Sequence, residues 1–185
     1  MRFIQTIKRS KFLQRVYSDA CTFYYCGLTV ISPKLNTKAR YRAAFGKKLD
    51  LQNPKTLNEK ILWLKLYNYI NNPLVAQCAD KYRVREYVKE CGLEDILVKL
   101  HGVYKTADEI PWESLPNQFV LKWNFGAGYN IVCTDKEKMD GEAVISQMKK
   151  WGKEKYWLPY SEMQYQHYHK LIICEELLNA KEGIR

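Results

Sequence analysis

The spacing of apolar residues predicts two helices in the first half of the chain. Apolar side chains recur at helical spacing over residues 57–70 and 80–91. Thr56 followed by Glu59 has the pattern of a capping box at the start of the first helix, and Gly92 is a typical terminator after the second. The stripe that we expect the first helix to bury comprises Leu57, Ile61, Leu64, Tyr67 and Ile70.

Four short apolar runs in the second half have the length and composition of strands. They cover residues 97–104, 119–123, 130–133 and 171–174. A helix is expected between the third and fourth runs, with a capping box at Thr134 and Glu137 and an end at Gly152. Its expected buried face comprises Val144, Met148 and Trp151. Helices, strands, a helix and a strand in this order predict an α+β fold.

The first 50 residues differ from the rest of the chain in charge. The chain carries 30 basic and 20 acidic residues, a formal charge of +10. Residues 1–50 hold 11 basic and 2 acidic side chains, an excess of +9, which leaves +1 for residues 51–185. We therefore expect a basic helical arm over residues 1–50 and a separate domain over residues 51–185. Because the charge belongs to one end, we expect no specific nucleic-acid partner.

The arm has two interpretations. Apolar residues at helical spacing run through it in two sets, Phe3, Ile4 and Ile7, then Leu13, Val16, Tyr17 and Ala20. Residues 34–50 are basic and loosely helical as far as Gly46. A basic, aromatic helix of this kind is typical of a segment lying on an anionic membrane surface. The alternative is a helix that packs on the rest of the protein and keeps its charges in water.

Several other classes of protein find no support in the composition. The six cysteines, at positions 21, 26, 78, 91, 133 and 174, form no C-x-x-C pair and indicate reduced thiols in a cytoplasmic protein. His167 and His169 could share a metal, but no ligand beside them completes a site, so no metal site is predicted. The longest uncharged stretch, residues 20–33, is too short for a spanning helix, and Asp19 argues against a signal peptide. We expect a cytoplasmic protein, peripheral at the inner membrane surface if the arm binds lipid.

The most informative stretch for chemistry is residues 119–133. Lys122 lies at the end of an apolar strand, where its charge is costly to bury unless something negative meets it. The following Gly126-x-Gly128 leaves backbone N–H groups that can approach an anion, so the stretch predicts a phosphate cradle. It is not a Walker A loop, because no Gly-Lys-Ser/Thr follows and the loop leads into a strand. As a bare pattern it fits an ordinary glycine-containing hairpin as well.

Five sequence blocks extend the argument beyond this pattern. They are FGKKL at 45–49, NPKTLNEKILWLKL at 53–66, ADKYRVREYV at 79–88, LHGVY at 100–104 and LPNQFVLK at 115–122. With these blocks in order, the chain from about residue 32 resembles the TupA-like ATP-grasp family. This family is named for an enzyme of teichuronopeptide synthesis and occurs among bacterial genes for capsular and other surface polysaccharides. The resemblance implies a helical pair followed by a short antiparallel sheet with a packed helix.

The resemblance also implies roles for individual residues. Lys122 is expected to contact the α- and β-phosphates of ATP. A glycine loop is expected to fold over the phosphates, and a hinge at the end of a later strand to hold adenine and ribose. The loop comprises Gly126, Ala127, Gly128, Tyr129 and Asn130, and the hinge comprises Glu175, Glu176, Leu177 and Leu178. The family loop usually reads His-Gly-Ser-Gly-Gly, whereas this chain has Phe125 and Tyr129 at the outer positions.

The reaction implied by the resemblance is ATP-dependent ligation of a carboxylate to an amine through an acyl phosphate. Family members hold Mg²⁺ with acidic residues well downstream of the hinge, and this sequence ends at Arg185. We therefore expect the first half of the nucleotide cleft, as a truncated gene product, an excised piece or a degenerate paralogue. Alone it should be inactive, and it should self-associate or need a partner over its truncated face. The alternatives are a glycosyltransferase-like polysaccharide biosynthesis protein, although no Asp-x-Asp signature occurs, or a non-catalytic remnant that docks on a membrane or partner through residues 1–50.

Overall fold

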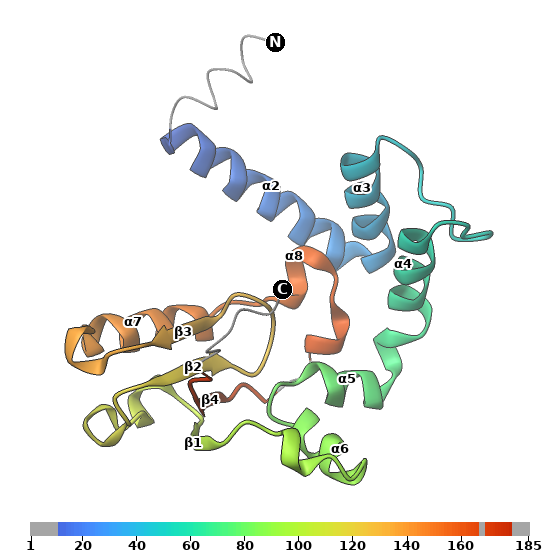
Figure 1. Cartoon of the computed structure of the whole chain (residues 1–185). Helices are drawn as coiled ribbons and strands as arrows, with labels where there is room; N and C mark the ends of the chain where they lie inside the picture. Colours follow the sequence, from blue (N-terminus) through green and yellow to red (C-terminus); the bar gives the residue numbers. More distant parts are fainter. Residues whose placement is uncertain (1–10, 167–168, 179–185) are drawn as a thin grey trace. The chain divides into compact units, whose positions relative to one another are not determined.

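The computed structural model describes residues 11–166 and 169–178, which form two compact units. In the described chain, unit 1 contains residues 11–72 and 155–166, and unit 2 contains residues 73–154 and 169–178. Figure 1 shows the elements of both units. The division of the chain after residue 50 stays a prediction.

Unit 1 is helical. Its elements are α2 (Lys11–Ile31), α3 (Pro33–Phe45), α4 (Leu57–Tyr67), η1 (Tyr69–Asn71), α8 (Trp157–Tyr160) and η6 (Met163–Tyr165). The arm is therefore helical over residues 11–31 and 33–45, while its first apolar set, Phe3, Ile4 and Ile7, lies outside the described residues. Helix α3 ends where the sequence predicted, because Gly46 adopts a left-handed φ of 67° and its amide donates to the Arg42 carbonyl.

Helix α4 begins as predicted but buries a different face. The capping box is confirmed, because Thr56 Oγ1 accepts from the Glu59 amide while the Glu59 carboxylate accepts from the Thr56 amide. The predicted buried stripe is wrong, since Leu57 is 73% exposed and Ile61 45%. Leu62 and Leu66 pack instead against a small core of Tyr41, Leu49 and Leu51. Apolar residues occur on several faces of α4, so their spacing does not select the face that α3 and the following loop cover.

Unit 2 contains a four-stranded antiparallel sheet, which confirms the α+β fold. The strands are β1 (Leu100–Tyr104), β2 (Phe119–Trp123), β3 (Asn130–Cys133) and β4 (Ile172–Glu176), in the order β1-β4-β2-β3. The last strand in sequence therefore lies between the first two. Residues 119–123 and 130–133 were predicted to the residue, whereas the run at 97–104 forms a strand only from Leu100 because a 3-10 turn precedes it.

One face of the sheet is covered by helix α7 (Gly141–Gly152). Phe119, Leu121 and Trp123 alternate along β2 and are almost completely buried, and the Trp123 indole donates to the Met148 carbonyl at 3.1 Å. Residues Val120 and Lys122 therefore point to the opposite face. That second face carries the site described below.

Helix α7 starts later than the sequence predicted. Its cap is Asp140, whose Oδ1 accepts from the Ala143 amide at 3.0 Å, and the capping box expected at Thr134 is wrong. Residues 136–138 form a 3-10 turn, because Lys136 is hydrogen-bonded to the segment before β2. Its amide donates to Asn117 Oδ1 at 2.9 Å, and its ammonium group donates to the Leu115 carbonyl at 2.8 Å.

The predicted helix at 80–91 also begins later than expected. Helices α5 (Pro73–Ala79) and α6 (Val84–Glu90) are separated by a turn at residues 80–83. Asp80 Oδ1 accepts from the amides of Tyr82 and Arg83, at 2.8 and 3.1 Å, and so delays the start of α6. Gly92 follows α6 with a φ of 73°. The remaining short helices of unit 2 are η2 (Glu94–Ile96), η3 (Ala107–Glu109), η4 (Trp112–Ser114) and η5 (Lys136–Lys138).

No helix among the described residues combines the length and the apolar character needed to cross a membrane.

Candidate functional site

The site begins with an ion pair on the sheet face opposite α7. Lys122 of β2 faces Ile173 of β4, and Val120 faces Glu175, so the lysine and the glutamate project from the same face of adjacent strands. The Lys122 ammonium group pairs with Glu175 Oε2. Their side chains are 25% and 10% exposed. Glu175 is therefore the negative group that the sequence required beside Lys122.

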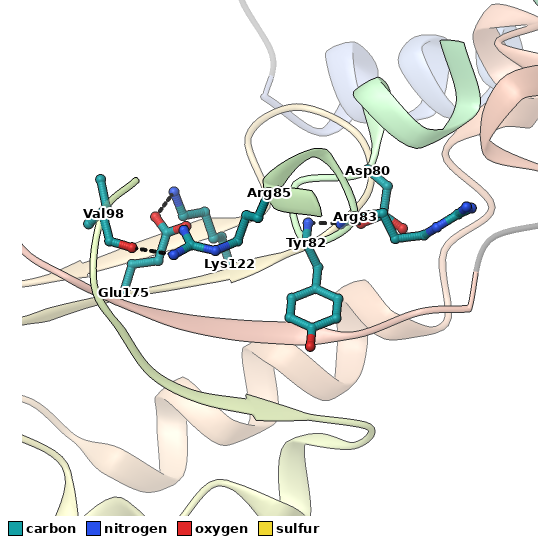
Figure 2. A network of polar contacts seen from close by, with 7 residues as sticks. All are labelled: Asp80, Tyr82, Arg83, Arg85, Val98, Lys122 and Glu175. Atoms are coloured by element: carbon teal, nitrogen blue, oxygen red, sulfur yellow. Dashed lines mark hydrogen bonds and ion pairs between the residues drawn. The ribbon is translucent and has the colours of Figure 1, made fainter. Parts of the chain in front are cut away.

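A second cation holds the other oxygen of the same carboxylate. Arg85 of α6 places Nη1 at 3.7 Å from Glu175 Oε1, and its Nη2 donates to the Val98 carbonyl at 2.6 Å. Figure 2 shows Glu175 between the Lys122 and Arg85 side chains. Glu175 is only 7% exposed, and two cations from different elements hold its carboxylate in one orientation.

A third cation, Lys81, reaches the glycine loop. Its ammonium group donates to the Gly126 carbonyl at 2.6 Å. Burial lowers the pKa of Lys81, the nearby positive charge of Lys122 lowers it further, and Asp80 and Glu175 offset part of that shift. These surroundings therefore disfavour the ammonium form of Lys81 relative to that of a lysine in water. An added anion would reverse that effect.

Asp80 and Asn124 fix the backbone that carries Lys81. Asp80 is 2% exposed, and its Oδ2 accepts from Asn124 Nδ2 at 2.8 Å. Asn124 also donates to the His169 carbonyl and accepts from the Leu171 amide, each at 3.0 Å. The Lys81 amide donates to the Asn124 carbonyl at 2.9 Å. The turn before α6, the start of the glycine loop and the approach to β4 are therefore tied together.

The glycine loop is anchored at both outer positions and open at its tip. Phe125 is 2% exposed, and its ring centroid lies 5.3 Å from that of Tyr129, whose hydroxyl donates to Glu154 Oε2 at 2.6 Å. Gly126 and Gly128 have φ values of 66° and 82°, a region in which other residues are strained. Ala127 and Gly128 are exposed, and within the described chain their amides donate to no backbone carbonyl. The tip therefore presents free N–H groups, as an anion cradle requires.

A family model described as TupA-like ATPgrasp matches residues 59–185, about two thirds of the chain. The chain belongs to the TupA-like ATP-grasp family. No curated protein and no solved structure matches it significantly. All three cations of the site and Glu175 lie inside the matched region, whereas α2 and α3 lie outside it.

The remaining predicted residues of this ATP-grasp protein lie around the same sheet. Asn130 is the β3 partner of Lys122 and is exposed. Glu176 ends β4, where its amide donates to the Lys99 carbonyl at 2.9 Å. Leu177 is half-buried and Leu178 is 68% exposed. The structure thus brings Lys122, the loop and Glu175 together, while the role of residues 175–178 as a hinge that holds adenine and ribose stays a prediction.

Neither Lys81 nor Arg85 was predicted from the sequence as a site residue. Both belong to the block at 79–88, which was used only for the family resemblance and for a helix. The signal that could have found Lys81 is an Asp-Lys pair shortly before a helix, because an Asp side chain there can accept from the next backbone amides and hold the intervening residue in a turn. Arg85 reaches Glu175 only through the packing of α6 near the sheet.

The ATP-grasp family also implies Mg²⁺. Within the described chain, no group of three His, Cys, Asp or Glu side chains could hold a metal ion, and His167 lies outside that part. The donor set at the site is cationic, with a carboxylate already held by Lys122 and Arg85. It fits the phosphates of a nucleotide and does not fit a metal bound by protein ligands alone.

Proposed function

We propose that this protein binds ATP in unit 2, with the phosphates at Lys81, Lys122 and the tip of the loop at residues 126–130. The observation that supports this most directly is the pair of lysine ammonium groups beside a loop in which the Ala127 and Gly128 amides donate to no backbone carbonyl of the described residues. Family membership supports it independently. The proposal also includes two features implied by the family. They are ATP-dependent ligation through an acyl phosphate in the biosynthesis of surface polysaccharides, and a need for Mg²⁺.

The charges in the site suit a polyphosphate. Three cations meet two carboxylates, and Asp80 already accepts from two amides and from Asn124. Phosphate oxygens near Lys81 would favour its charged form and raise its lowered pKa. Each hydrogen bond to a charged group contributes about 1.5–3 kcal/mol, so two lysines can dominate the phosphate affinity.

The Lys122–Glu175 pair suggests how the lysine is prepared for this role. In the free protein Glu175 neutralises the lysine charge and holds the Lys122 side chain on the sheet face opposite α7. A bound phosphate would share the ammonium group with Glu175, which itself stays paired with Arg85. The arrangement therefore orients the cation before the nucleotide arrives, which reduces the ordering cost of binding.

In the ligation that the family performs, ATP phosphorylates a carboxylate and an amine then displaces the phosphate. The described residues would bind and orient the phosphates and stabilise the negative charge on them. The carboxylate and the amine are proposed only as chemical classes.

Calorimetric titration with ATP tests the proposal. Lys122→Met should weaken ATP binding roughly 10- to 150-fold, the equivalent of about 1.5–3 kcal/mol. The matched control is Lys138→Met, which removes a lysine that is 83% exposed and paired with Asp135 on the surface. It should leave the ATP affinity unchanged. Adenosine should bind the wild type and Lys122→Met equally, because it has no phosphates.

Circular dichroism should confirm that both variants fold. Equal ATP affinity in the wild type and Lys122→Met would contradict the phosphate assignment. A complete absence of ATP binding by the wild-type chain would contradict the proposed function as a whole.

A further inference from the structure

Helix α2 exposes an apolar stripe along its whole length. Every described side chain of residues 12–20 is exposed. With 3.6 residues per turn, the exposed large apolar residues of the helix fall within an arc of about 140°. They include Phe12, Val16, Tyr17, Phe23, Val30 and Ile31, and Phe23 is the most exposed at 82%. Exposed apolar surface of this extent marks an interaction site.

The opposite side of α2 is fixed by contacts inside unit 1. Thr29 is 3% exposed, and its hydroxyl lies 2.7 Å from that of Ser161. The Tyr25 carbonyl accepts from Asn36 Nδ2 at 3.0 Å. Arg40 lies between the rings of Tyr25 and Tyr160, at 4.1 and 4.3 Å from their centroids. Because these contacts prevent rotation of the helix, the stripe stays directed outward.

A cationic cleft adjoins the stripe. It has a volume of about 590 Å³ and lies between α2 and the basic segment that contains α3. Lys38, Arg42 and Lys48 line it together with Tyr24 and Tyr25, and no carboxylate does. Within the described chain, no ion pair neutralises these three cations. Tyr24 is 56% exposed and lies in the apolar arc, so it connects the stripe to the cleft.

We propose that α2 lies flat in the surface of an anionic phospholipid bilayer, with the cleft binding a lipid phosphate. The apolar stripe enters the boundary between headgroups and acyl chains, and Lys38, Arg42 and Lys48 meet the headgroups. At 1.5 Å per residue, the 21 residues of α2 present about 31 Å of stripe to the membrane plane. The helix and the cleft lie outside the family match.

The charge distribution favours lipid over a second copy of the chain. Residues 11–50 carry 8 basic and 2 acidic side chains, an excess of +6. A dimer formed through the stripe would bring two uncompensated cationic clefts near each other, whereas an anionic membrane neutralises them. The exposed aromatic rim formed by Tyr17 and Tyr24 is also typical of a membrane interface.

Vesicle sedimentation of the full chain tests this proposal. The wild type should bind vesicles of phosphatidylglycerol and phosphatidylcholine at low salt and should bind vesicles of pure phosphatidylcholine at least tenfold more weakly. Salt at 0.5 M should release the protein, because screening then shortens the range of the electrostatic attraction to about 4 Å. Failure of the wild type to bind the anionic vesicles would overturn the proposal.

Two exposed sets of side chains separate the stripe from the cleft. Phe23→Ser with Val30→Ser should lower the partition coefficient at least tenfold, and so should the triple change of the cleft lysines and arginine to Gln. The charge-matched control changes three exposed lysines, Lys55, Lys60 and Lys153, to Gln. It should weaken binding by less than threefold. Equal loss in the cleft variant and the control would overturn the headgroup site.

Two further measurements distinguish lipid from a second copy of the chain on the stripe and from free phosphate in the cleft. Light scattering should find the wild type monomeric without lipid; a dimer that Phe23→Ser with Val30→Ser dissociates would overturn the proposal in favour of a second copy. Inorganic phosphate at 10 mM and constant ionic strength should not release the protein from vesicles. Release would mean that the cleft takes free phosphate, and would overturn the lipid assignment.

Discussion

Asp80 offers the sharpest structural test of unit 2. Replacing it by alanine removes a carboxylate that is 2% exposed and accepts three hydrogen bonds. Two come from the amides of Tyr82 and Arg83, and the third comes from Asn124. After the change, these three donors lie in a buried site without their acceptor.

The contacts set the size of the effect. Three hydrogen bonds to a charged group, at about 1.5–3 kcal/mol each, give the upper range. Neighbouring bonds are not additive, and removing the carboxylate also removes the cost of burying its charge. We therefore expect Asp80→Ala to lower the free energy of unfolding by about 3–5 kcal/mol. Asp80→Asn should lower it less, because Oδ1 can still accept from the two amides while the new amide group opposes that of Asn124.

Urea unfolding followed by tryptophan fluorescence measures this change. With an m value of about 2 kcal/mol per molar urea, Asp80→Ala should shift the midpoint by roughly 2 M. The control is Asp108→Ala, which removes a carboxylate with a 70% exposed side chain that pairs with Lys149 at the surface. Its midpoint should be unchanged. Hydrogen exchange of β2 assigns the loss to unit 2. If Asp80→Ala shifted the midpoint no more than Asp108→Ala, the argument from buried hydrogen bonds would be refuted.

Two further predictions concern titration. Nitrogen-15 NMR should find the pKa of Lys81 below its reference value of 10.5 in the free protein and higher with ATP bound; no rise with saturating ATP would contradict the phosphate contact. Between the lowered pKa and 10.5 the unfolded chain keeps a proton that the native Lys81 has released, so stability should increase with pH in that window, and Lys81→Met should abolish the increase. Burial raises the pKa of the Cys174 thiol to about 12 and also raises that of Cys133. A disulfide reagent at pH 8 should therefore label the exposed Cys78 and Cys91 and leave both strand thiols unreacted until urea unfolds the protein. Detection of the label on Cys174 of the native protein by mass spectrometry would contradict the burial of this strand.

The sequence by itself determined the features that depend on neighbours in the chain. The capping box at Thr56 and Glu59 needs only residues three apart, and the end of α3 needs only a glycine that tolerates positive φ. Strands β2 and β3 were predicted to the residue because each is a short apolar run bounded by turn residues. The sequence also indicated that Lys122 requires a negative partner, since burying an unpaired charge is costly.

Only the tertiary structure decided which groups meet. Glu175 pairs with Lys122 because β4 enters the sheet between β1 and β2, an order that no local spacing encodes. Lys81 reaches the loop because Asp80 forms a turn in place of the first turn of the predicted helix, and Asn124 holds the carboxylate of Asp80 beside the loop. The buried face of α4 was likewise selected by its neighbours, because apolar residues surround that helix. Periodicity fixes local conformation, whereas partners distant in the chain are fixed by packing and by the need to pair buried polar groups.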